Sequence, residues 1–201
     1  QAANSFTGTT RISGGTLQLS AAGALQQSTL DYNNFGGSLS WGPLTSAALG
    51  GLSGNQNLAL ANAAGGSVSL TVGASNGDSS YAGVLSGTGS LTKSGSGAFT
   101  LAGTSTYTGA TVVSAGTLNV AGALPGSNVV VNAGRLAGTG SVRSLDMNGG
   151  AVTPGDGLGV LTILNGATLD SGAVELNLND GVTRDQLRVI AGNVTLGAGR
   201  G

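Results

Sequence analysis

The stretch that decides the fold is residues 106–120, TYTGATVVSAGTLNV, which has an earlier copy at residues 6–19, FTGTTRISGGTLQL. The copies lie 101 positions apart, and 7 of the 14 aligned positions are identical. A second echo relates GTGSL at 87–91 to GTGSV at 138–142. Such self-similarity among short strands and glycine turns is typical of a solenoid, in which each coil buries its apolar face against neighbouring coils.

Short runs with strict two-residue alternation recur along the chain, as in VSLTV at 68–72 and VELNL at 174–178. In a strand, this alternation places aliphatic side chains on one face and polar side chains on the other. Glycine and asparagine pairs separate the runs, and both residues accept the positive φ of tight corners. We therefore predict an all-β solenoid of about eight coils with Gly/Asn-rich turns. An antiparallel sandwich is the less favoured alternative.

One segment departs from this pattern. Residues 44–49, LTSAAL, follow Pro43 and precede Gly50 and Gly51. Proline favours the first helical position and glycine ends a helix, so these residues form either one helical turn or an excursion loop.

The composition excludes several classes of protein. Only 7% of the 201 residues are charged, with 7 Lys+Arg against 8 Asp+Glu, and no basic stripe is present to bind nucleic acid. The near-zero net charge favours self-association. The 39 glycines follow no Gly-X-Y period, which excludes collagen, and the 39% of hydrophobic residues argues against a disordered linker. Aromatic residues make up 3%, so we expect a thin aliphatic core.

Cellular context follows from what the chain lacks. It contains no cysteine, which suits a chain that crosses an oxidising compartment before it folds. No apolar run approaches the roughly 18 residues of a membrane helix, and no signal peptide opens the chain. We therefore expect residues 1–201 to form a single β-helix segment of a longer chain, without a membrane span.

Residues 87–109, GTGSLTKSGSGAFTLAGTSTYTG, resemble the autotransporter-associated β-strand repeat, also called the passenger-associated transport repeat of type V secretion. The resemblance predicts a full repeat at 49–120 and the tail of an earlier copy at 1–20. Farther on, TPGDGLGVLT at 153–162 and DQLRV at 185–189 resemble elements near the C-terminal end of passengers. Residues 153–201 are therefore expected to form passenger-like C-terminal coils.

The resemblance also implies a fold and a location. Passengers of this family are right-handed parallel β-helices that are displayed outside the cell after export across the outer membrane. We accordingly expect an extracellular or cell-surface protein.

The chain offers few residues for catalysis. Glycoside hydrolysis needs two carboxylates at a defined separation. The candidate carboxylates are Asp146, Asp156, Asp170, Glu175, Asp180 and Asp185. Each suits a turn or a solvated strand face, and the chain has no histidine to act as a general base or metal ligand. We therefore predict no catalytic, cofactor or metal site; an acid pair drawn from Asp156, Glu175 and Asp185 is the enzymatic alternative.

Two surface features remain. Tyr32, Phe35 and Trp41 lie close together in a loop-rich stretch, where they either contact a partner or plug the end of the core. Five threonines are expected to face outward and to form ladders between coils, or simply to serve as strand residues: Thr7, Thr9, Thr108, Thr111 and Thr117.

These features favour a non-catalytic structural or adhesive surface module. It would associate end to end into a fibre or surface layer, with a cell-surface glycan or protein as a candidate partner. A carbohydrate-active β-helix enzyme is one alternative. The other is a passive spacer or folding scaffold whose passenger function lies elsewhere.

Overall fold

A computed structural model describes residues 4–155, 159–176, 178–179 and 183–197. Within these ranges the chain contains 22 strands and no helix, so the predicted all-β class is confirmed. The strands are β1 (Thr9–Arg11), β2 (Gly15–Gln18), β3 (Leu25–Asp31), β4 (Gly37–Ser40), β5 (Ser46–Ser53), β6 (Leu58–Ala59), β7 (Ser69–Val72), β8 (Ser79–Tyr81), β9 (Leu85–Ser86), β10 (Ser90–Lys93), β11 (Ala98–Leu101), β12 (Thr111–Val113), β13 (Thr117–Val120), β14 (Ala123–Val131), β15 (Arg135–Gly138), β16 (Ser141–Pro154), β17 (Val160–Ile163), β18 (Ala167–Val174), β19 (Leu178–Asn179), β20 (Thr183–Arg184), β21 (Gln186–Val189) and β22 (Val194–Leu196).

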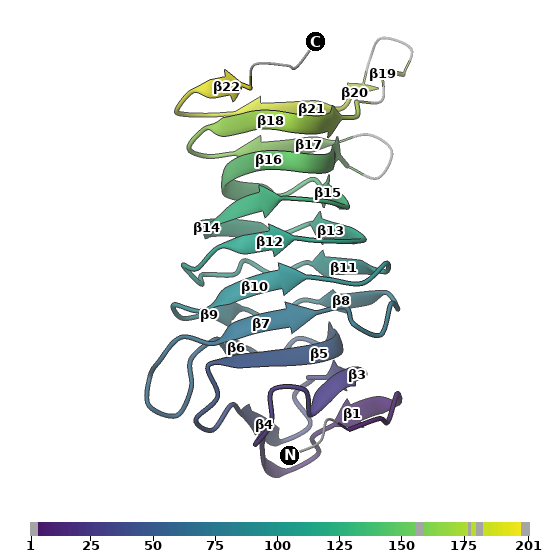
Figure 1. Cartoon of the computed structure of the whole chain (residues 1–201), viewed down its shortest axis with the longest axis vertical. Coiled ribbons are helices and arrows are strands. Elements are labelled where there is room, and N and C mark those ends of the chain that lie inside the picture. Colours follow the sequence, from purple (N-terminus) through teal and green to yellow (C-terminus); the bar gives the residue numbers. More distant parts are fainter. Residues whose placement is uncertain (1–3, 156–158, 177, 180–182, 198–201) are drawn as a thin grey trace.

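The strands stack as the rungs of a rod, with β1 and β2 near one end and β22 at the other (Figure 1). One column runs from β5 through β7, β10, β12 and β14 to β16, and a second contains β8, β11, β13 and β15. The 14-residue β16 turns a corner and belongs to both columns. All these pairs are parallel; among the described strands only β19 and β20 pair in the antiparallel direction.

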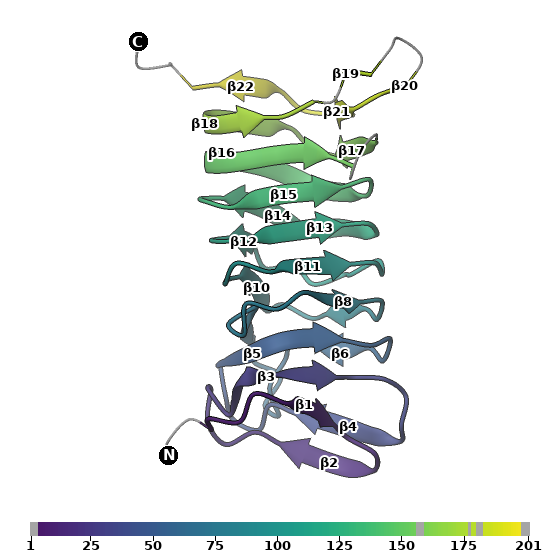
Figure 2. The ribbon, with the colours of Figure 1, turned by 90° about the vertical axis from the view of Figure 1, so that its right-hand side faces the viewer.

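The chain winds as a right-handed spiral. The strands at the front of Figure 1 run from left to right. Figure 2 views the right-hand side of that picture, and there β8, β11, β13 and β15 run away from the front of Figure 1 while the chain rises from coil to coil. Stacked positions lie 16 to 27 residues apart, as Val129 pairs with Leu145 and Leu58 with Leu85. The predicted right-handed parallel β-helix of about eight coils is thus confirmed, and the antiparallel sandwich is excluded.

The interior of the rod is a continuous column of aliphatic side chains. Within one strand column, Leu70, Leu91, Val129 and Leu145 occupy the same inward row, and each is essentially inaccessible to solvent. The buried Thr111 fills this row in the coil between Leu91 and Val129. Burying one such side chain contributes about 1.5–3 kcal/mol. Each coil therefore gains stability mainly from the coil on either side of it.

Residues 44–49 are not helical. Most of them lie in β5, which continues as a strand through Gly50 and Gly51. A Cβ at Gly50 would lie 2.6 Å from the backbone of Gln27 in the coil below, so the missing side chain allows close strand stacking. Here glycine permits pairing between coils instead of ending a helix, and tertiary contact overrides the local signal.

The two sequence copies share a side-chain motif. In the first copy, the Ser28 hydroxyl donates to the Gly8 carbonyl at 2.5 Å and lies 2.7 Å from Thr10 Oγ1. In the second copy, Ser127 donates to Gly109 at 2.7 Å and lies 2.7 Å from Thr111 Oγ1. A serine of each following coil thus fixes the register of the preceding Gly-x-Thr turn.

Thr111 itself corrects a prediction. It is buried, whereas Thr7, Thr9 and Thr108 are exposed as expected and Thr117 is half-buried. Thr111 pairs with Leu91 and Val129, so it occupies an inward row. Its hydroxyl is satisfied there by Ser127 and by the buried hydroxyl of Tyr107.

Replacing Tyr107 with phenylalanine should lower the free energy of unfolding by about 1 kcal/mol, because Thr111 loses a buried partner. Burial raises the pKa of Tyr107 from 10.0 to about 12. The folded state therefore holds this proton more tightly than the unfolded chain, so the stability it contributes is complete below pH 10 and is lost between pH 10 and 12. Urea titrations at several pH values should show the wild type losing its advantage over Tyr107→Phe in that window.

The exposed Thr108→Val variant is the matched control, with an expected change within about 0.5 kcal/mol. If the difference in free energy of unfolding between wild type and Tyr107→Phe stays unchanged from pH 9 to 12, the raised pKa of Tyr107 is contradicted.

Candidate functional site

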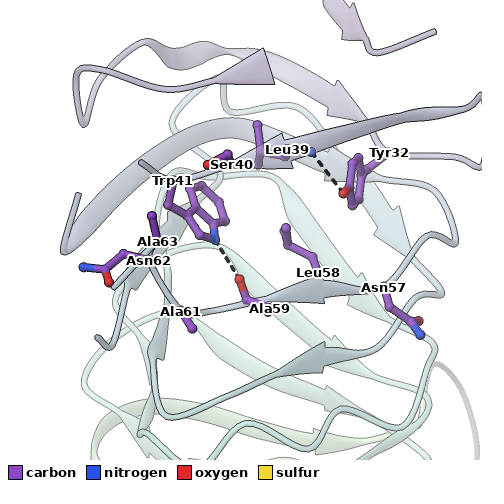
Figure 3. A pocket seen from close by; sticks show the side chains of 10 residues that line it. All are labelled: Tyr32, Leu39, Ser40, Trp41, Asn57, Leu58, Ala59, Ala61, Asn62 and Ala63. Carbon is purple, nitrogen blue, oxygen red and sulfur yellow. Dashed lines mark hydrogen bonds between the residues drawn. The ribbon is translucent and has the colours of Figure 1, made fainter. Parts of the chain in front are cut away.

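Tyr32 and Trp41 lie on a small cavity between β4, β6 and the turn that follows β6 (Figure 3). Its volume is about 270 Å³. The Trp41 indole donates from Nε1 to the Ala59 carbonyl at 2.7 Å, and the Tyr32 hydroxyl accepts from the Leu39 amide at 3.2 Å. Both side chains are nearly inaccessible, at 2% and 4% exposure. Their rings therefore pack in the core, and half of the ten residues that line the cavity are alanine or asparagine.

Phe35 lies apart from this cavity and is 42% exposed. The guanidinium of Arg11 lies 4.5 Å from its ring centroid, and Arg11 Nη2 donates to Asp31 Oδ2 at 2.9 Å. The structure thus separates the three predicted contact residues. Only Phe35 presents its ring to solvent, as part of a surface stack with an ion pair.

The described candidate carboxylates contact different partners. Glu175 accepts from Arg135 and from the hydroxyl of Thr153, and the buried Asp185 accepts from the Gly159 amide at 2.8 Å. The half-buried Asp146 and the exposed Asp170 lie on β16 and β18. Two further candidates, Asp156 and Asp180, lie outside the described residues. In the described part of the chain, no three carboxylates gather as metal ligands would.

Lys93 is a charged residue in the core, with only 1% of its surface exposed, which the sequence patterns did not single out. It occupies an inward position between Val72 and Val113 of the adjacent coils. Its Nζ donates to the carbonyls of Ser94 at 2.5 Å, Gly95 at 2.9 Å and Ala115 at 3.3 Å. The ammonium group therefore joins two coils at a corner. The sequence signal was present, since lysine replaces an aliphatic residue in the alternating run of β10.

Large apolar side chains are exposed mainly at the two ends of the rod. Phe6 lies at the N-terminal end, and besides Phe35 the others follow β17: Val174, Leu176, Ile190, Val194 and Leu196. Leu196 is the most exposed, at 72%. These end coils carry side chains of the kind that the middle coils bury. Among the described residues, no helix is long and apolar enough to cross a membrane.

These features define a class of protein: a parallel β-solenoid built from repeated coils. The sequence model of the passenger-associated transport repeat matches residues 1–19 and 91–120. A stretch of 95 residues, 47% of the chain, is 38% identical to an extracellular serine protease of Serratia marcescens. This match covers 9% of the relative, so the chain spans a small part of that protein's length. The repeats and the solenoid together fit an autotransporter passenger, which confirms the resemblance predicted from the sequence.

Proposed function

We propose that this chain is a non-catalytic structural segment of an exported passenger, which extends a rod and serves as an adhesive surface module. The observation that carries this proposal is the aliphatic interior that continues from coil to coil. Such an interior makes each coil a spacer of constant rise, about 4.8 Å between stacked strands. The transport repeat and the extracellular relative support export to the cell surface or beyond.

The positions of the carboxylates support a non-catalytic role. Glu175 and Asp185 are held by backbone and side-chain partners in the C-terminal coils. The relative is a protease, but this chain contains no histidine and therefore cannot assemble a Ser-His-Asp triad by itself. The proteolytic function of that relative is accordingly not assigned to this chain.

Self-association through the rod ends is the second part of the proposal. Among the described strands, β1 pairs only with β3 and β22 only with β18. These edges and the exposed apolar residues of β22 support contact with a second copy, since open strand edges favour pairing. Such a head-to-tail contact is heterologous and would extend into a fibre.

Sedimentation should show assemblies that grow with protein concentration. The exposed Leu196→Lys variant should shift them toward the monomer without loss of folding, because charge at the end opposes stacking. Asn55→Lys, an exposed site between β5 and β6, is the control and should sediment as wild type. A monomer at every concentration would reject self-association.

The non-catalytic part has its own test. Incubation with polysaccharides and protein substrates should yield no products above background. Turnover that disappears in Glu175→Gln or Asp185→Asn would reject this part of the proposal.

A further inference from the structure

A shallow trough of about 300 Å³ crosses the outer face of β11, β13, β15 and β16. Figure 2 views this face of the rod. Two rows of outward positions form it: Ala98, Thr117 and Arg135 in one, and Asn119, Ala137 and Thr153 in the other. Although Ala137 points outward, it is only 8% exposed. The trough therefore has a small apolar floor between polar side chains from successive coils.

The polar side chains retain unused hydrogen-bonding capacity. In the described part of the chain, Arg135 engages Thr153 and Glu175 through Nη1 alone, leaving Nε and Nη2 without a protein partner. Asn119 makes one long bond from Nδ2 to Thr100 at 3.5 Å, and its Oδ1 bonds to none of the described residues. The Thr117 hydroxyl bonds to no described residue. Donors and acceptors thus line the same trough and are open to solvent.

The charge of the trough is balanced. The Arg135 guanidinium is paired with Glu175, so the site offers directional donors without a net positive charge. Phosphates and other anions are bound where basic charge is in excess, and they would meet the Glu175 carboxylate here. The trough therefore favours an uncharged ligand.

The backbone excludes an added peptide strand. β13 pairs with both β11 and β15, so this part of the sheet has no open edge for a further strand. Nor does the trough hold a deep apolar pocket for an anchoring side chain, because its apolar lining is alanine and glycine. The ligand that fits these constraints is a chain rich in hydroxyl groups that lies along the rod. Neighbouring coils are about 4.8 Å apart, so a chain lying along the rod meets polar side chains of several coils in turn.

We propose that this trough binds an uncharged glycan, with Thr117, Asn119 and Arg135 as hydrogen-bonding residues. The inference rests on the proposed adhesive role and names the chemistry of its partner. Binding is weak for a single oligosaccharide, because the trough has no aromatic ring on which sugar can stack. Several adjacent rods would strengthen it through multivalency.

The test is titration of the ¹⁵N-labelled chain with cellohexaose, maltohexaose, chitohexaose and, as the acidic probe, hexagalacturonate. At least one neutral hexamer should shift the signals of Thr117, Asn119 and Arg135. The double variant Thr117→Val, Asn119→Leu should weaken this binding about tenfold. Thr92→Val is the control on the other strand column, paired with Thr71 and Val112, and should bind as wild type.

Three results would overturn the proposal: no shift with any neutral hexamer, unchanged binding by the double variant, or preference for hexagalacturonate. The same samples separate this inference from the proposed function. New reducing-end signals would reject the non-catalytic role while leaving the binding site in place. Intact hexamers without binding would reject the site and leave the structural role standing.

Discussion

Gly138→Ala is expected to prevent stable stacking of the central coils and to lower the free energy of unfolding by at least about 3 kcal/mol. Gly138 ends β15 with φ of 119°, a conformation that side-chain-bearing residues rarely adopt. A Cβ there would lie 2.1 Å from the Val120 carbonyl oxygen of the coil below. That oxygen belongs to backbone, so no side chain can move aside to relieve the clash.

The control separates backbone strain from the clash between coils. Gly65 also has positive φ, at 78°, but a Cβ there would meet nothing within 4 Å. Gly65→Ala should therefore cost only about 1 kcal/mol, from strain alone. Urea unfolding followed by far-UV circular dichroism measures both variants. Equal losses in the two would show that coil contact at Gly138 is not as tight as described.

Lys93→Met is expected to lower the free energy of unfolding by about 2 kcal/mol. The variant keeps a flexible apolar stem in the core but removes the donor for three carbonyls at the corner, those of Ser94, Gly95 and Ala115. Relief from burying a charge offsets part of this loss. Thr92→Val, at the neighbouring outward position, should change stability by less than about 0.5 kcal/mol.

The pH dependence of the free energy of unfolding gives a second, independent test of the burial of Lys93. Burial lowers the pKa of Lys93 below its usual 10.5, an effect partly opposed by the charge of Asp78. The folded state therefore releases this proton before the unfolded chain does. The penalty for burying the charge is complete below the folded pKa and is relieved as the pH rises through it toward 10.5. The advantage of wild type over Lys93→Met should widen over that interval, and a narrowing would contradict the lowered pKa of Lys93.

Much of the fold follows from local patterns. Alternating aliphatic residues predict strands with one buried face, and repeated glycine corners predict coils, because both signals are read over a few residues. The phase of alternation is harder to assign. In ATVV at 110–113, two adjacent valines leave it undefined, and the register with Leu91 and Val129 turns Thr111 inward.

The candidate site was less predictable for the same reason. Tyr32, Phe35 and Trp41 are neighbours in sequence, but the path of the coil buries two of them and exposes the third. The polar trough joins positions 16 to 19 residues apart, such as Ala98, Thr117 and Arg135, which share no local motif. Such sites become visible only once the register between coils is known.

The account depends on neighbouring strands that run in one direction, in the register described. Amide-to-amide nuclear Overhauser contacts in the perdeuterated protein measure this directly, without crystals. We expect contacts that link the β7–β10–β12–β14 column, with partner numbers increasing together along each pair, as in Leu91 with Thr111 and Lys93 with Val113. Partner numbers that increase along one strand while decreasing along its neighbour would contradict the parallel solenoid.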